Sequence, residues 1–153
     1  MDFIALTRDF YSRVEIAGSI RREKPIVHDI DLCAIAARPV SEFPEAAKSA
    51  GAKVVRFGGE YATIVFRGVQ VNVLFVTDET WGAGLMWSTG PKGHTIGMNI
   101  KADELGFKFN RTGIRRRSDD TLKPTPTEED IADLLHWTYK PPEKRGEKER
   151  KEY

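Results

Sequence analysis

The sequence predicts an α+β fold in which a mixed or antiparallel sheet carries helices on one face. Short runs rich in Val, Ile and Phe alternate with single helical segments in the first half of the chain. Gly58-Gly59 and Arg67-Gly68 separate three of these runs, which indicates two consecutive hairpins. From Thr77 onward the pattern changes to helices and one hairpin, which predicts a second, smaller module.

The chain has 153 residues, enough to bury a core in one compact unit or two small ones. Its formal net charge of +1 does not decide for or against a nucleic-acid partner, because the position of the charges matters. Cys33 is the single cysteine and should be a small core residue, so a disulfide framework is excluded and a cytoplasmic location is expected. No run approaches the roughly 20 apolar residues of a membrane span, and no signal peptide is predicted.

An amphipathic helix is expected over residues 1–13, because Phe3, Ile4, Leu6 and Phe10 recur at helical spacing. The other elements of the first half are apolar runs bounded by Gly or Pro. In chain order they are a strand at 14–20 that runs into a Gly-Ser turn, a strand at 28–37, a helix at 41–51 with Ser41 as N-cap and Gly51 at its end, and strands at 52–57, 61–67 and 69–76.

The second half is expected to be mainly helical. In chain order its elements are helices at 78–87 and 92–106 around a Thr-Gly-Pro break, a hairpin at 107–117, a loop at 118–127, and a helix at 127–137 with Thr127 as N-cap. The tail from Tyr139 carries two adjacent prolines and dense mixed charge. It is therefore expected to be solvated, and flexible from about residue 141.

Two aspartates, Asp29 and Asp31, alternate with apolar residues in the predicted strand at 28–37. Side chains two positions apart in a strand share a face and lie roughly 6.5 Å apart. Two carboxylates this close repel each other unless a cation compensates them. Solvated acids on an open sheet face are the simpler interpretation, but the apolar flanks predict a central strand.

The residues upstream of these acids suit a phosphate group. Gly18-Ser19 predicts a turn with free backbone N–H groups and a hydroxyl, and Arg21 and Arg22 add guanidinium groups. Mg²⁺ usually takes one or two carboxylates together with substrate phosphates. The combination predicts phosphoryl or nucleotidyl transfer with two metal ions.

Three segments in the right order resemble family X DNA polymerases, within the nucleotidyltransferase superfamily. The first is Gly18-Ser19, Arg21-Arg22 and Asp29-Ile30-Asp31, which resembles the G-S-x-R-R…D-x-D signature. The second, residues 87–116, is similar to the family's nucleotide-binding segment, and the third, residues 127–147, to the end of its thumb. The usual lyase and fingers-like regions do not fit before residue 18. The resemblance therefore implies a minimal enzyme, with a nucleotidyltransferase-type palm at 1–90 and a small helical and hairpin thumb at 91–153.

The resemblance also places a third catalytic acid on a neighbouring strand, where this chain has Asn72. The predicted catalytic and metal-binding positions are thus Asp29, Asp31 and Asn72. An amide is a poor general base and brings no charge, so the chain is expected to be catalytically impaired. Asn72 is interpreted as an engineered replacement, as a natural departure, or as an asparagine that only bridges strands. Glu60 and Asp78 are not expected to substitute, because neither is predicted on the face of the acid pair.

The implied activity is template-directed addition of nucleotides to a primer 3′-OH with release of pyrophosphate, in short-gap filling during DNA repair. Two Mg²⁺ ions are the expected cofactors, with Mn²⁺ able to substitute. The expected partners of the monomer are dNTP, with rNTP as an alternative, and primer-template or gapped duplex DNA. Two other hypotheses remain: a nucleotidyltransferase that acts on a protein or small molecule, and an inert DNA- or nucleotide-binding module.

By resemblance, the residues expected to bind nucleotide are Gly18, Ser19, Arg22, His28, Trp87, Ser88, Gly90 and Thr95. Ser88 is smaller than the aromatic residue common at the sugar gate, Thr95 departs from the usual Asn, and Trp87 and His28 have packing and capping as alternative roles. Residues 92–117 are strongly basic, which favours contacts to DNA phosphates. The expected DNA-binding residues are Lys92, Asn110, Arg111, Arg115, Arg116 and Arg117.

Overall fold

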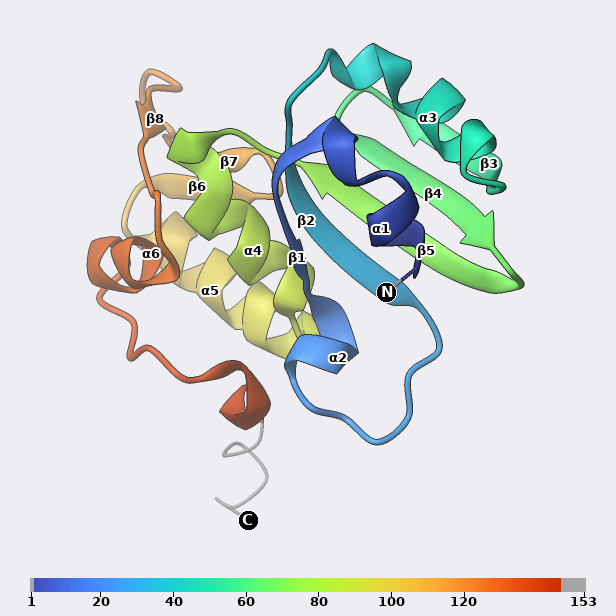
Figure 1. Ribbon diagram of the computed structural model, residues 1–153. Helices are drawn as coiled ribbons and strands as arrows, with labels where there is room; N and C mark the ends of the chain where they lie inside the picture. Colours follow the sequence, from blue (N-terminus) through green and yellow to red (C-terminus); the bar gives the residue numbers. More distant parts are fainter. Residues whose placement is uncertain (1, 147–153) are drawn as a thin grey trace.

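The computed structural model describes residues 2–146 and shows an α+β fold built on a five-stranded mixed sheet (Figure 1). The strands lie in the order β1-β2-β5-β4-β3, with β2 and β5 parallel and the other neighbours antiparallel. Their bounds are β1 Tyr11–Ile16, β2 Ile30–Ala36, β3 Lys53–Gly58, β4 Tyr61–Phe66 and β5 Val69–Phe75. The predicted fold class and the two consecutive hairpins are confirmed.

Helices cover both faces of this sheet. α1 (Asp2–Leu6) and α3 (Phe43–Ser49) pack on the face that carries Leu32 of β2. α4 (Trp81–Thr89) packs on the opposite face, which carries the next residue, Cys33. Consecutive strand residues point to opposite faces, so Leu32 and Cys33 face different helices. The expectation of helices on one face only was therefore incomplete.

The N-terminal segment differs from the prediction. The helix expected over 1–13 is limited to α1 and a 3₁₀ turn at Arg8–Phe10, after which β1 begins at Tyr11. Phe3 and Phe10 are both fully buried in one core, so their spacing reflects shared packing and not a continuous helix. Pairing of β1 with β2 outweighs the weak local preference for helix.

Two predicted boundaries in the first half are also wrong. The strand expected at 14–20 already ends at Ile16, and the expected Gly-Ser turn begins a short helical turn, α2 (Gly18–Arg21). Ser41 lies inside a 3₁₀ turn (Val40–Glu42), so the N-cap position of α3 falls to Glu42, which makes no capping hydrogen bond through its side chain. Gly51 follows the helix with a φ of 92°, as expected for a terminating glycine.

The second part of the chain has its own core, in which Met98, Phe109 and Ile131 are fully buried. It contains a three-stranded sheet in the order β6-β7-β8. The bounds are η3 Asp78–Thr80, α5 Lys92–Glu104, β6 Phe107–Asn110, β7 Gly113–Arg116, β8 Leu122–Lys123, α6 Glu128–Leu134 and η4 Pro142–Lys144. The predicted helices and hairpin are confirmed, whereas β8 lies within the segment expected to be a loop.

The start of α6 is fixed against α4. Thr127 is the N-cap, as predicted, because its Oγ1 accepts a hydrogen bond from the N–H of Asp130 at 3.2 Å. The Gly82 N–H in α4 donates to the Thr125 carbonyl at 2.7 Å, and a Cβ added at Gly82 would collide with the Thr127 carbonyl. Glycine is therefore needed where α4 meets this segment.

The C-terminal segment is packed through Gly146, which corrects the expectation of a solvated tail. Arg145 is only 1 % exposed, and Gly146 lies against Pro91. Residues 147–153 lie outside the described residues, so their expected flexibility stays a prediction. The division into parts 1–90 and 91–153 also stays a prediction, since α4 contributes to two separate cores.

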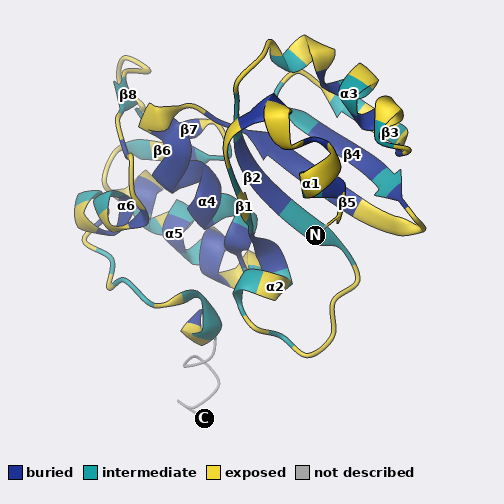
Figure 2. Cartoon of the chain, in the orientation of Figure 1, coloured by how far each residue is buried: buried dark blue, intermediate teal, exposed yellow. Residues whose placement is uncertain are grey.

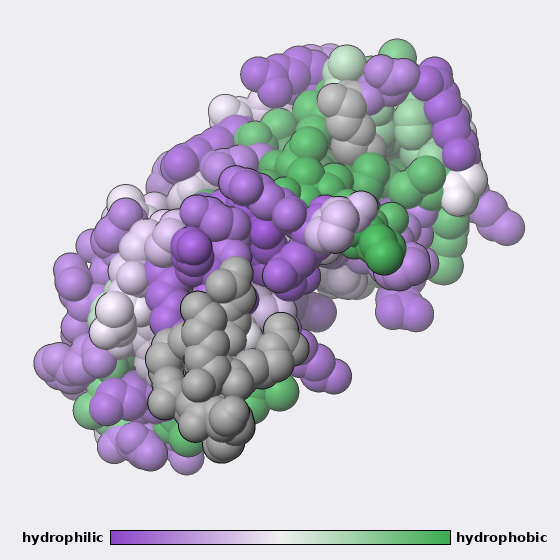
Figure 3. Space-filling view, turned by 90° about the horizontal axis from the view of Figure 1, so that it is seen from below, coloured by the Kyte–Doolittle hydropathy of each residue, from purple (hydrophilic) through white to green (hydrophobic). Residues whose placement is uncertain are grey.

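Burial follows this arrangement (Figure 2). The central strands and α4 are mostly buried, whereas the loop at 22–29 is largely exposed. Seen from below, hydrophobic residues gather on the half with the large sheet, and the half with α5 and α6 is mainly hydrophilic (Figure 3). Within residues 2–146, no helix is long and apolar enough to cross a membrane.

Candidate active site

The two aspartates lie at the start of β2. Asp31 is in the strand and Asp29 directly precedes its first residue, Ile30. Because β2 pairs in parallel with β5, Asp31 lies opposite Asn72, on the sheet face that also carries Cys33 and α4. The fold thus brings together all three residues predicted as catalytic and metal-binding positions, and their roles remain predictions.

Both polar atoms of the Asn72 side chain take part in hydrogen bonds. Its Nδ2 donates to Oδ1 of Asp31 at 3.1 Å. Its Oδ1 accepts from the Thr63 hydroxyl at 3.1 Å and from Nε2 of Gln70 at 3.2 Å. The same Gln70 nitrogen lies 3.3 Å from Oδ2 of Asp29. Two amides therefore connect the two carboxylates, which agrees with the interpretation of Asn72 as a residue that bridges strands.

The environment makes Asp31 easier to protonate than an ordinary aspartate. Burial raises the pKa of this carboxyl and Asp29 raises it further, while the hydrogen bond from Asn72 and the charge of Arg22 act in the opposite direction. Burial is the largest of these effects. A cation beside Asp31 would favour its charged form.

Gly18 is required by its contact with Asp31. Its φ is +61°, a conformation that glycine adopts readily, and a Cβ at this position would collide with Oδ2 of Asp31. The backbone N–H of Ala17 donates to the Asp31 carbonyl at 2.7 Å. The Gly-Ser segment and the acid are therefore held as one unit.

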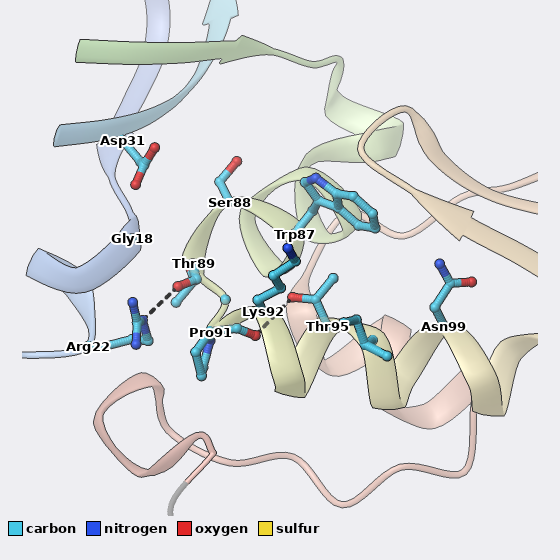
Figure 4. A pocket seen from close by; sticks show the side chains of 12 residues that line it. Gly18, Arg22, Asp31, Trp87, Ser88, Thr89, Pro91, Lys92, Thr95 and Asn99 are labelled. Carbon is cyan, nitrogen blue, oxygen red and sulfur yellow. Dashed lines mark hydrogen bonds between the residues drawn. The ribbon is translucent and has the colours of Figure 1, made fainter. Parts of the chain in front are cut away.

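Three cavities meet at Asp31. The first, called the helix cavity, has a volume of about 360 Å³ and lies between β2 and α5 (Figure 4). The second, the loop cavity, has a volume of about 550 Å³ and lies under residues 22–29. The third, the strand cavity, has a volume of about 220 Å³ and lies over β4 and β5. Besides Asp31, the helix cavity is lined by Gly18, Arg22, Trp87, Ser88, Thr89, Gly90, Pro91, Lys92, Thr95, Ile96 and Asn99. The loop cavity is lined by Ser19, Arg22, Lys24, Pro25, Ile26, His28 and Asp29. The strand cavity is lined by Leu32, Tyr61, Asn72, Leu74, Trp87, Ser88 and Arg111.

All eight residues predicted to bind nucleotide line one of these cavities. Ser19 and His28 line the loop cavity, and Arg22 borders both it and the helix cavity. Nε of Arg22 donates to the Thr89 carbonyl at 2.9 Å, which fixes the guanidinium at the junction (Figure 4). Trp87 packs edge-on against Phe109, so it combines core packing with a place on the cavity wall.

The residues predicted to bind DNA are more dispersed. Lys92 lies on the helix cavity, whereas Arg111 and Arg115 line a fourth cavity of about 670 Å³ beside the β6–β7 hairpin, called the outer cavity below. Oδ1 of Asn110 accepts from the Thr112 N–H at 2.9 Å and so stabilises the hairpin turn. Two further arginines have acidic partners within the chain: Arg116 pairs with Asp119, and Arg117 pairs with Asp103.

A buried ion-pair cluster links the two parts of the chain. Both terminal nitrogens of Arg21 donate to Glu128, at 2.8 and 2.6 Å, and Arg145 pairs with the same carboxylate at 3.0 Å. Arg21 also donates to Oγ1 of Thr89 at 2.8 Å. Arg21 therefore positions the wall of the helix cavity, and Arg22 is the arginine left at the cavities.

The Glu128 carboxylate is stabilised despite its burial. Burial would raise the pKa of Glu128, but the hydrogen bonds and charges of Arg21 and Arg145 outweigh it and hold the pKa below its usual value. Sequence reasoning missed this cluster, because only the tertiary fold brings residue 21 to the acid. Gln70 was also missed, although its place two residues before Asn72 was a usable signal.

The donor set at the acids fits a divalent cation only in part. Asp29 and Asp31 supply hard carboxylate oxygens, which suit Mg²⁺. Asn72 is neutral, and its oxygen already accepts two hydrogen bonds. Across residues 2–146, no group of three or more His, Cys, Asp or Glu side chains is arranged to hold a metal ion.

The C-terminal half of the chain, with α4–α6 and the β6–β7 hairpin, lies against this site. Residues 84–146 match the family model of the DNA polymerase beta thumb. The match covers α5, the β6–β7 hairpin, α6 and the packed C-terminal segment, and it confirms the small helical thumb in the predicted fold. It supports the resemblance to family X, and among curated proteins no match to the chain is found.

Proposed function

We propose that the chain is a template-directed DNA polymerase of the family X type, which adds nucleotides to a primer 3′-OH in short DNA gaps. One observation carries the proposal: Asp31 lies where three cavities meet, directly beside a segment that matches a DNA polymerase thumb. A nucleotidyl transfer site must hold a nucleoside, a triphosphate and an attacking hydroxyl around one centre, and this geometry provides three such spaces.

Each cavity suits one part of the reaction. The loop cavity, with Ser19, Arg22 and His28, suits the triphosphate and the departing pyrophosphate. The helix cavity, with Trp87 and Thr95, suits the nucleoside. The strand cavity is left for the primer terminus. In the reaction the 3′ oxygen forms a bond to the α-phosphorus, the bond to pyrophosphate breaks, and the hydroxyl proton leaves to solvent.

Asp29 and Asp31 would hold Mg²⁺, with Mn²⁺ as a substitute, and bound metal would supply charge stabilisation at the phosphates. The chain's own contribution is to fix the two carboxylates through Gln70 and Asn72. Asn72 neither accepts a proton readily nor attracts a second cation. Slow turnover is therefore part of the proposal, and the protein would act as a monomer.

Two other functions are alternatives to this one. An inert DNA- or nucleotide-binding module is favoured by the hydrogen-bonded state of Asn72. A nucleotidyltransferase that acts on a protein or small molecule is disfavoured by the thumb match, because such an enzyme does not need a DNA-gripping module.

Primer extension on a duplex with a one-nucleotide gap tests the proposal. The chain should extend the primer slowly with Mg²⁺, and Asn72→Asp should raise kcat by orders of magnitude. Extension by neither protein would remove the polymerase proposal. Equal rates would show that position 72 is not the third catalytic position. Parallel assays with rNTP test the gate at Ser88, where discrimination of many thousandfold would exclude a relaxed gate.

A further inference from the structure

Arg111, in the turn between β6 and β7, borders two of the cavities. Its side chain lines the strand cavity beside Asp31 and Asn72, and it also lines the outer cavity beside the hairpin. Tyr61 lies under it in the strand cavity, and Glu60 lies beside it in the outer cavity. Among residues 2–146, Arg111 is the one residue that lines both of these cavities.

The contacts that hold Arg111 in this position are weak. Its Nη2 lies 3.5 Å from Oε1 of Glu60, and the two side chains are 42 % and 43 % exposed. Its guanidinium carbon lies 4.8 Å from the centre of the Tyr61 ring. An exposed ion pair of this length is easily displaced by a stronger anion. A phosphate binds arginine through charge-assisted hydrogen bonds and is such an anion.

Tyr61 offers a supported aromatic surface next to the acids. Its ring packs against the buried cluster that contains Leu74 and Trp81. It lies two residues before Thr63 on the same face of β4, and Thr63 donates to Asn72. Burial and the charge of Asp31 raise the pKa of its hydroxyl, so the side chain is neutral near pH 7. A neutral ring beside an arginine is a typical platform for a nucleotide sugar or base.

We propose that Arg111 exchanges partners: it pairs with Glu60 in the free protein and with a backbone phosphate of a DNA strand in the complex. In the complex, the adjacent nucleotide packs on the ring of Tyr61. This inference rests on the proposed function and extends it to a defined strand path. When Arg111 moves to the phosphate, the strand cavity and the outer cavity become one groove.

The charges around the outer cavity define which wall the strand follows. Arg115 lies on the hairpin side, and no hydrogen bond or ion pair involves its side chain within residues 2–146, so it is available to a second phosphate. The opposite wall carries Asp78 and Glu79, together with Arg38, which pairs with Glu42. The strand therefore follows the hairpin and not the η3 wall.

A double-mutant cycle tests the exchange without any catalytic readout. The measurement is the equilibrium affinity for a fluorescein-labelled gapped duplex, by anisotropy, without metal or nucleotide. Arg111→Ala should weaken binding about tenfold. Glu60→Gln should tighten binding about threefold, because it releases Arg111. In the Arg111→Ala background, Glu60→Gln should change nothing. An equal gain in both backgrounds would reflect general charge alone and would overturn the proposal.

Two further variants address Tyr61. Tyr61→Phe keeps the ring and should bind like the unmodified chain, whereas Tyr61→Ala should weaken binding about tenfold. Unchanged binding by Tyr61→Ala would overturn its role as a platform. Circular dichroism and thermal melting must show that each variant is folded, and a Tyr61→Ala chain that unfolds leaves the Arg111 cycle as the deciding test.

Arg67→Ala is the matched control for Arg111→Ala. Arg67 also pairs with an exposed acid, Asp2 at 2.6 Å, and lies 4.7 Å from the centre of the Phe66 ring, but it lines none of the four cavities. It should leave the affinity unchanged, and a loss equal to that of Arg111→Ala would overturn the proposal. If the unmodified chain does not bind the duplex, the proposed function falls with this one. If it binds and the cycle is additive, only this inference fails.

Discussion

The amide nitrogen of Asn72 donates a hydrogen bond to Asp31 across 3.1 Å, at the position where the resemblance implies a carboxylate. Asn72→Asp would replace this donor by a third negative charge beside Asp31 and Asp29. We expect the variant to have a lower melting temperature than the parent chain without metal, because the three carboxylates repel each other. Millimolar Mg²⁺ should restore the melting temperature by binding only the folded state. Scanning fluorimetry with and without Mg²⁺ measures both effects.

Asn72→Ala provides the control for this prediction. It removes the same hydrogen bonds from Asp31, Thr63 and Gln70 but adds no charge. Its melting temperature should fall and recover less in Mg²⁺ than that of Asn72→Asp, because only Asp29 and Asp31 remain to bind the ion. Equal recovery of both variants would show that metal binding does not involve position 72.

Glu128 is predicted to be a main determinant of stability. Its side chain is 4 % exposed and pairs with Arg21 and with the fully buried Arg145. Glu128→Gln should lower the free energy of unfolding by about 3–5 kcal/mol, because the buried Arg145 and the partly buried Arg21 lose their countercharge. Urea denaturation at pH 7 measures this. Glu42→Gln is the control, since it removes an exposed pair with Arg38 and should cost less than about 1 kcal/mol.

The same carboxylate predicts a pH dependence. The folded state holds the pKa of Glu128 below its usual value, so its stabilising effect is complete above the unfolded pKa of about 4.3 and is lost as the pH falls through the lower folded pKa. The stability difference between the parent chain and Glu128→Gln should therefore shrink on the acid side of about pH 4.3. A difference that stays constant down to pH 2.5 would contradict the assignment.

The sequence predicted the central hairpins well because Gly59 and Gly68 lie at tight turns with positive φ. It predicted the first helix poorly, because Phe3 and Phe10 enter the same core from different elements. When the buried surface is formed by distant strands, residue spacing alone cannot distinguish one continuous helix from two elements that pack in the same core.

The candidate site shows the same division. Residues close to each other in the sequence, such as Gly18 and Asp31, were predicted to belong to one site, and they lie in contact. Arg21 and Glu128 are 107 residues apart in the sequence, so no local pattern indicates their ion pair. Arg21 and Arg22 look equivalent in sequence, and only the buried acid assigns them different roles.

Gly18 is predicted to be needed for its lack of a side chain. Gly18→Ala should weaken binding of Mg²⁺-dNTP at least about tenfold, because the new Cβ would displace Oδ2 of Asp31. Gly59→Ala is the control, since Gly59 has a similar φ of +72° but no neighbouring atom within 4 Å of the added carbon. It should lower only the melting temperature, by the strain of a left-handed backbone. Equal loss of nucleotide affinity in both variants would argue against the contact with Asp31.

Arg115 and Arg117 are predicted to differ in their contribution to DNA binding. Arg115 lines the outer cavity without an ion pair in the part of the chain that the structure describes, whereas Arg117 lies 2.8 Å from Asp103 and 3.2 Å from the Phe107 carbonyl. Arg115→Ala should lower the affinity for gapped duplex about fivefold and reduce the slope of log Kobs against log salt by about 0.9, as expected for one lost phosphate contact. Arg117→Ala should leave that slope unchanged, because the Arg117 charge already has a partner. Anisotropy titrations between 50 and 200 mM salt, roughly the range over which phosphate contacts dominate, separate the two. A larger slope change for Arg117→Ala would place the DNA on the opposite side of the hairpin.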